Sequence, residues 1–240
     1  MSGLASVLAL ALLPAAGNFA GGLLAEWTRP SPRALNWALH AASGIVIAIV
    51  AVELIPRSLD NLSGWWVGTA FAAGGALYLA AESAIERLLG SAATRMGMIY
   101  LAVAVDLLSD GLMIGSGGAV SMSLALTLAA GQVLADVPEG YAAVANFRDK
   151  GVGRGRRIAL SASFAIPIVG AALASFFLLR DAPPAAKFSV LALVSGLLTV
   201  AAVEDMLEEA HESAGDTRRS IVAFVGGFTL FTFVTAGLGD

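Results

Sequence analysis

The sequence contains no cysteine, which excludes disulfide bridges, thiolate metal ligands and thiol catalysis. Charge is also scarce, because charged residues make up 13% of the 240 positions while hydrophobic residues make up 58%. No Walker-type glycine loop and no basic patch with interleaved aromatic residues occur, so neither ATP hydrolysis nor nucleic-acid binding is expected. No Lys or Arg precedes the first apolar run, so a cleaved signal peptide is not expected either. This composition is typical of a polytopic membrane protein.

Apolar segments long enough to cross a bilayer recur along the whole chain, since each crossing needs roughly 20 residues. The uncharged stretch Gly115-Ser116-Gly117-Gly118 is expected to form the turn between the fourth and fifth of these segments. We therefore predict an all-α protein with one transmembrane domain over residues 1–240. Its eight transmembrane helices are expected near 3–25, 34–57, 63–86, 95–116, 121–147, 157–179, 186–209 and 219–238.

The distribution of positive charge predicts the orientation of these helices. Most of the 14 Lys and Arg residues lie in the loops that follow the odd-numbered helices. Loops rich in Lys and Arg stay on the cytoplasmic side of a membrane. We therefore expect a multi-pass protein of the cell (cytoplasmic) membrane whose N- and C-termini are both extracytoplasmic.

Four carboxylates lie within the fourth and fifth predicted helices. Asp106 and Asp110 are four residues apart, and Asp136 and Glu139 are three apart, so each pair projects from one helical face. An ionised acid in hydrocarbon costs several kcal/mol and by default marks a functional site. No Lys or Arg that could neutralise these acids occurs between Val105 and Ala143, so protons or a metal cation must do so.

Further donors accompany the acids on the same faces. Ser109 and Met113 continue the first face and Gln132 continues the second. Pro138 is expected to bend its helix and to free the carbonyl of Leu134. Together these groups predict an oxygen-rich site for a divalent cation. Two alternatives remain: protonated acids hydrogen-bonded across the helix interface, or a path for protons alone.

Several of these segments resemble the motifs of the ZIP family of divalent metal-ion transporters. The stretch Asp106–Gly115 resembles the family's helix-4 motif His-Asn-x-Pro-Glu-Gly-x-x-x-Gly, and Ala135–Gly140 resembles its helix-5 motif His-Glu-x-Pro-x-Gly. Glu53-Leu54-Ile55-Pro56 is similar to the end of helix 2 in that family. Asp205–His211 is similar to the Glu-Leu-Ile-Pro-Glu-Ala-His near the end of helix 7.

The resemblance implies a secondary transporter that moves Zn²⁺, Mn²⁺ or Fe²⁺ into the cytosol, with the metal as substrate, no cofactor and no enzymatic activity. It also implies an elevator-like motion of helices 1, 4, 5 and 6 past a scaffold that forms a homodimer within the lipid bilayer. The small residues Gly74, Gly75, Gly226 and Gly227 would allow close helix approach in this scaffold.

A faint internal repeat agrees with the 3+2+3 inverted repeat of that family. Ser43-Gly44 is followed after ten residues by Glu53, and Ser195-Gly196 is followed after ten by Asp205. Aligned in this way, helices 1–3 match helices 6–8 with the opposite orientation. Such repeats are typical of secondary transporters with a binding site near the bilayer midplane.

The chain also departs from the family pattern. Asp106 and Leu107 stand where the family has His and Asn, Ala135 stands at the helix-5 His, and Ile166-Pro167 replaces a frequent Glu-Pro. A second, bridged metal site therefore looks incomplete. We predict one site, formed by Asp106, Asp110, Asp136 and Glu139. Its oxygen donors favour Mn²⁺, Fe²⁺ or Mg²⁺ relative to Zn²⁺, although zinc also binds carboxylates.

Acids outside the central helices suggest an entrance and an exit for the ion. Glu53 is a candidate entrance ligand, and the candidate exit ligands are Asp205, Glu208, Glu209 and His211. The alternative for these last four is an ordinary solvated helix end. Two further functional hypotheses remain: a ZIP-fold relative that senses metal or conducts protons without transporting metal, and an intramembrane hydrolase that uses the paired carboxylates.

Overall fold

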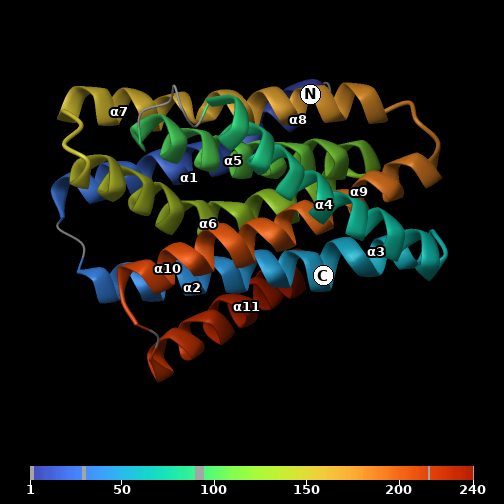
Figure 1. The fold of residues 1–240 in the computed structure, drawn as a ribbon. Helices are drawn as coiled ribbons and strands as arrows, with labels where there is room; N and C mark the ends of the chain where they lie inside the picture. The colour runs from blue at the N-terminus through green and yellow to red at the C-terminus, as the bar shows by residue number, and fades with distance from the viewer. Residues whose placement is uncertain (1–2, 29–30, 90–94, 216, 240) are drawn as a thin grey trace.

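The computed structural model describes residues 3–28, 31–89, 95–215 and 217–239 of the chain, and all the regular secondary structure in these ranges is helical (Figure 1). The helices form eight consecutive rods, three of which are built from two or three segments joined end to end. In chain order the rods are α1 (Gly3–Trp27); α2, η1 and α3 (Pro32–Ala48, Ile49–Leu54 and Ile55–Leu59); α4 (Gly64–Leu89); α5 (Arg95–Val120); α6 (Met122–Asp149); α7 and α8 (Arg154–Ser163 and Ala165–Leu179); α9, η2 and α10 (Pro184–Ala201, Ala202–Met206 and Leu207–Ser213); and α11 (Arg218–Gly239).

Six rods in the described ranges are long and apolar enough to cross a membrane: α1, α2–α3, α5, α7–α8, α9–α10 and α11. The other two, α4 and α6, are long but less apolar. In α6 the polarity comes from residues such as Gln132, Asp136 and Glu139, which lie in the interior. The chain is therefore an all-helical protein of the multi-pass membrane type, and its eight rods coincide with the eight predicted ranges to within a few residues.

The predicted turn at Gly115-Ser116-Gly117-Gly118 is wrong. Helix α5 continues through this stretch to Val120, and the chain reverses at Ser121. The Oγ atom of Ser121 accepts a hydrogen bond from the backbone N–H of Leu124 at 3.1 Å, which caps the start of α6. Gly115 instead serves helix packing, because a Cβ atom there would overlap the carbonyl oxygen of Ala172 in α8.

The helices pack in four extensive pairs, α1 with α6, α5 with α8, α2 with α11, and α4 with α9. Glycines bring the backbones together in each pair. Gly140 of α6 lies against the carbonyl of Asn18 in α1, and Gly44 of α2 lies against the carbonyl of Phe224 in α11. Gly196 of α9 similarly lies against the carbonyl of Phe71 in α4. Such small-residue contacts are typical of helix association in membranes.

Two groups of helices result from this pairing. The first, here called the central bundle, consists of α1, α5, α6, α7 and α8, and the second consists of α2, α4, α9, α10 and α11 with their short extensions. Helix α6 meets α2 and helix α5 meets α9 where the two groups face each other. The acids predicted from the sequence lie on α5 and α6, close to this boundary.

Candidate metal centre

Three carboxylates converge inside the protein. Asp106 and Asp110 of α5 and Glu139 of α6 each contribute one oxygen atom, and these oxygens all lie within 4.8 Å of one another. All three side chains are buried. These three residues are called the acid triad below. Among the described residues, no other group of three acids or histidines comes together in this way.

The local sequence explains why the triad forms. Asp106 and Asp110 lie one helical turn apart, so both project from the same face of α5. Helix α6 runs back along α5 after the cap at Ser121, and it is continuous through Pro138. The predicted faces of the two helices therefore meet.

The acids lack the partners that normally compensate for buried charge. Both carboxylate oxygens of Asp110 are buried without a hydrogen-bond partner among the described residues, as are one oxygen each of Glu139, Asp136 and Gln132. No Lys or Arg occurs between residues 96 and 147. Because an unsatisfied buried polar group is costly, this arrangement needs a cation or protons. The donors are all oxygens, which suits a hard divalent cation.

The remaining predicted ligands take different positions. Asp136 is fully buried but is not a member of the triad, and its Oδ1 accepts a hydrogen bond from Nε2 of Gln132 at 3.1 Å. The hydroxyl of Ser109 donates to the backbone carbonyl of Val105 at 3.1 Å. Met113 belongs to the apolar core and is fully buried. The structure thus joins three of the seven predicted central residues and places a Gln132–Asp136 pair one turn away on α6.

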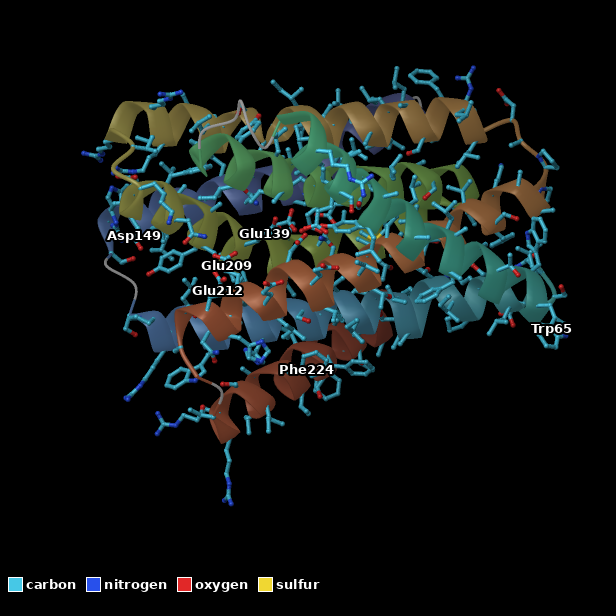
Figure 2. The ribbon with its side chains drawn as sticks, in the orientation of Figure 1. Trp65, Glu139, Asp149, Glu209, Glu212 and Phe224 are labelled. Carbon is cyan, nitrogen blue, oxygen red and sulfur yellow. The ribbon has the colours of Figure 1, made fainter. Side chains whose placement is uncertain are left out.

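An open cavity of about 230 Å³ connects the triad with one end of the molecule. Asp106 and Glu139 lie at its inner end, and helices η2 and α10 supply further acids. In Figure 2, Glu139, Glu209 and Glu212 follow one another from the middle of the protein toward that end. This cavity is called the vestibule below. The acids of η2 and α10 that line it are Glu204, Asp205, Glu208, Glu209 and Glu212.

Three of the four predicted exit residues line the vestibule, and the fourth lies elsewhere. Asp205, Glu208 and Glu209 line the vestibule, whereas His211 does not line it and its ring centroid lies 5.8 Å from that of His40. Asp205 accepts a hydrogen bond from the hydroxyl of Tyr78 in α4.

Sequence reasoning missed Asn146, which lines the vestibule and donates from Nδ2 to Glu209 Oε1 at 2.7 Å. Asn146 follows Glu139 by seven residues, so a search for polar residues two helical turns along the same face would have found it. It also missed Tyr78, since nothing in the apolar run around this residue distinguishes it from a core tyrosine.

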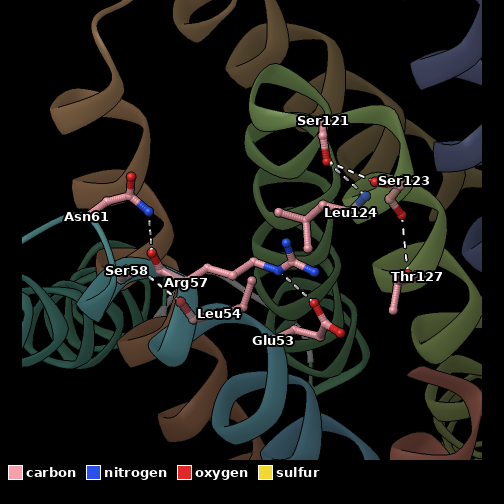
Figure 3. Close-up of polar contacts among 9 residues, drawn as sticks. All are labelled: Glu53, Leu54, Arg57, Ser58, Asn61, Ser121, Ser123, Leu124 and Thr127. Atoms are coloured by element: carbon pink, nitrogen blue, oxygen red, sulfur yellow. Dashed lines mark hydrogen bonds and ion pairs between the residues drawn. The ribbon is translucent and has the colours of Figure 1, made fainter. Parts of the chain in front are cut away.

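The predicted entrance residue Glu53 is buried in η1 and forms an ion pair with Arg57 at 2.8 Å (Figure 3). The two residues are four apart and share one helical face. Glu53 belongs neither to the acid triad nor to the lining of the vestibule. Its charge is therefore compensated locally, unlike the charge of the central acids.

The chain matches no protein-family model and no curated protein. Three converged carboxylates without a basic partner attract a cation, and the vestibule offers that cation a polar route to one end of the protein. The site contains no nucleophile with an adjacent imidazole, because the two histidines, His40 of α2 and His211 of α10, lie beside each other and belong neither to the triad nor to the lining of the vestibule.

Proposed function

We propose that this protein is a secondary transporter that moves divalent metal cations across the cytoplasmic membrane into the cytosol. The observation that carries the proposal is the acid triad, a buried cluster of oxygen donors inside a membrane-type helix bundle that opens into an acidic vestibule. A purely structural role would favour paired or hydrogen-bonded acids, whereas Asp110 has neither kind of partner among the described residues.

The donor set supports a hard or borderline cation. Carboxylate and amide oxygens suit Mn²⁺, Fe²⁺ and Mg²⁺, and zinc can also be held by carboxylates. The side chains that would coordinate the ion are those of Asp106, Asp110 and Glu139, with Asp136 and Gln132 one turn away. A proton relay needs titratable groups in a chain, but it does not need three oxygens gathered around one point.

The packing pattern supports a 3+2+3 inverted repeat and an elevator-like motion. In such a repeat the rods α1, α2–α3 and α4 correspond to α7–α8, α9–α10 and α11, and α5 corresponds to α6. The α1–α6 pair then corresponds to the α8–α5 pair, and the α2–α11 pair corresponds to the α9–α4 pair. The π-helical segments η1 and η2 also correspond, and each carries an acid ten residues after a Ser-Gly pair. In this proposal the central bundle carries the ion, and the second group forms the scaffold and the homodimer contact.

The positive-inside rule supports a vestibule that faces the cytoplasm, because the loops at that end carry most of the Lys and Arg. Both termini are then extracytoplasmic. An ion that leaves the triad would pass to the acids of η2 and α10 before it reaches the cytosol. Release there requires that the vestibule acids bind more weakly than the triad does, and their greater exposure supports this order.

The proposal is tested by uptake of Mn²⁺, Fe²⁺, Zn²⁺, Cd²⁺ and Mg²⁺ into proteoliposomes that contain the purified protein. The expected result is saturable uptake of at least one metal that Asp110→Asn abolishes. Asp60→Asn serves as the matched control, because Asp60 is exposed and lies far along the chain from the triad. Absence of uptake for every metal by folded protein, combined with proton flux through the liposomes, would instead establish the proton-conducting alternative.

A further inference from the structure

A fully buried asparagine in α1 has no hydrogen-bond partner within the described ranges of the chain. Neither the amide nitrogen nor the amide oxygen of Asn18 contacts a donor or acceptor among the described residues, and the side chain is 0% exposed. In a bilayer-spanning bundle such a group is costly, because no solvent compensates for the lost hydrogen bonds. The sequence offers no structural reason for Asn at this position, since its neighbours on the same face are Val7, Ala11 and Ala15.

The contacts between α1 and α6 fix the depth of Asn18 in the bundle. Gly17 lies against the carbonyl of Val133 and Gly21 lies against that of Val137, so the two helices run in the same direction. The backbone of Asn18 itself lies against Gly140. Asn18 therefore lies between the levels of Val133 and Gly140, which is the level of Asp136 and Glu139.

The contacts between α1 and α5 give the same depth independently. Val7 lies against Gly118, and α5 runs antiparallel to α1 because α5 and α6 are antiparallel. Asn18 lies eleven residues after Val7, and Leu107 lies eleven residues before Gly118. Each step covers about 16.5 Å along its helix, so Asn18 and Leu107 lie at the same level. Asn18 therefore shares the depth of Asp106 and Asp110 within the central bundle.

Helical geometry shows which acids are nearest to α1. On α6, the residues that face α1 include Val133, and Asp136 is displaced from that face by roughly 60°. On α5, Gly118 lies against Val7 of α1, and helical spacing puts Leu107 on the same face. Asp110 is displaced from this face by a similar angle. Asp110 and Asp136 thus form the side of the acid cluster next to α1. Like Asn18, and like Glu139 further from α1, both acids have buried oxygens without a partner among the described residues.

We propose that Asn18 is a specificity-determining residue that binds the water shell of the transported cation. Its amide makes no direct hydrogen bond to the acids among the described residues, and a metal-bound water is a group that could bridge them. The amide oxygen would accept from this water, while Asp110 and Asp136 accept from the ion's other waters or coordinate it directly. This inference rests on the proposed transport function and specifies the substrate as a partly hydrated divalent cation.

The proposal predicts a preference among metals. Mg²⁺ and Mn²⁺ favour six oxygen ligands, and Mg²⁺ in particular keeps several waters when it is bound to protein. Zn²⁺ prefers four ligands and loses its waters more readily. A bridging amide should therefore favour Mg²⁺ and Mn²⁺ over Zn²⁺, and its removal should weaken that preference.

The test combines uptake with a direct count of metal-bound water. Asn18→Leu keeps the size of the side chain but removes both polar atoms. Ser161→Ala is the matched control, since Ser161 is also buried without a partner but lies next to Gly22, one turn further along α1. Asn18→Leu is expected to raise the KM for Mn²⁺ about tenfold and that for Zn²⁺ by less than threefold, whereas Ser161→Ala changes neither.

The spectroscopic measurement uses Mn²⁺ bound to the full-length protein in ¹⁷O-enriched water, with electron–nuclear double resonance reporting the coordinated waters. The expected result is at least one coordinated water in the wild type and a changed ¹⁷O coupling in Asn18→Leu. An unchanged coupling together with an unchanged KM ratio would overturn the proposal. Asn18→Ser, which can still hold a water, should restore part of the Mn²⁺ preference. If the wild type neither binds nor transports any metal, it is the proposed function that fails.

Discussion

At the scale of single residues, the central acids lack basic partners in the part of the chain that the structure describes, whereas Glu26 has two. Glu26, at the end of α1, accepts hydrogen bonds from Nε and Nη2 of Arg157, and Arg154 approaches the same carboxylate at 3.6 Å. The side chain of Glu26 is 4% exposed and that of Arg157 is 11% exposed. This ion pair connects α1 to α7 and is largely shielded from water. It therefore has a structural role, whereas the acid triad has no basic partner among the described residues to give it one.

We predict that Glu26→Gln destabilises the protein by about 2 kcal/mol, because it removes the counter-charge from the guanidinium of Arg157, whose side chain is 11% exposed. The measurement is the thermal unfolding midpoint of the purified protein in detergent. Asp181→Asn is the matched control, since the Arg180–Asp181 pair is exposed on both sides and contributes little. Equal midpoints for the two variants would show that the Glu26 pair does not hold α1 and α7 together.

The residue scale also shows how far the sequence predicted the site. The pairing of Asp106 with Asp110 and the approach of Glu139 followed from helical spacing and from the antiparallel order of two adjacent helices. The partners Tyr78 and Asn146 did not follow, because they depend on which helices become neighbours in space. Small residues along whole helix faces determine which helices pack together. A single sequence does not show which two faces will pair.

At the scale of elements, glycine decides how closely the helices approach. The eight helical ranges could be predicted from apolar length alone, but the stretch Gly115–Gly118 was taken for a turn because glycine is common in turns. In a membrane helix the same residue permits backbone contact, and the backbone hydrogen bonds within α5 satisfy its polar groups. A glycine-rich turn and a glycine-rich helix contact have the same sequence pattern. They differ in whether a neighbouring helix, here α8, packs against the glycines.

This interpretation predicts that Gly115→Val separates α5 from α8. Its side chain would overlap the carbonyl oxygen of Ala172 and the hydroxyl of Ser175, so we expect a loss of stability of about 2 kcal/mol. Thermal unfolding in detergent measures this loss. Gly170→Val on α8 is the control, since nothing lies within 4 Å of its added Cβ. A turn at Gly115 would tolerate the substitution, so wild-type stability of Gly115→Val would contradict the packing role.

At the scale of the whole molecule, a hydrogen bond beside the vestibule connects the two groups of helices. Asn146 of α6 belongs to the central bundle, and Glu209 belongs to α10 in the second group. Both residues also line a second cavity of about 340 Å³, which lies further toward the end of the molecule. The bond therefore lies where the vestibule continues outward. An elevator-like displacement of the central bundle would have to break this bond in each cycle.

We predict that joining these two positions covalently stops transport. The chain has no cysteine, so Asn146→Cys/Glu209→Cys introduces the only two thiols, which a short bifunctional methanethiosulfonate reagent can bridge. We expect the bridge to reduce metal uptake by at least tenfold, and a reductant to restore it, because the bridge holds the central bundle against α10. The uncrosslinked double variant reports any separate effect of losing Glu209 from the vestibule.

The matched control joins two elements that are expected to move together. Ser220 of α11 donates to Oδ1 of Asn36 in α2 at 2.6 Å, and both helices belong to the second group. The pair Asn36→Cys/Ser220→Cys, bridged by the same reagent, should therefore retain the uptake of its unbridged form. Continued transport with α6 bridged to α10 would mean that the ion leaves the triad without relative motion of the two groups. A fixed pore that is gated by side chains would then replace the moving bundle.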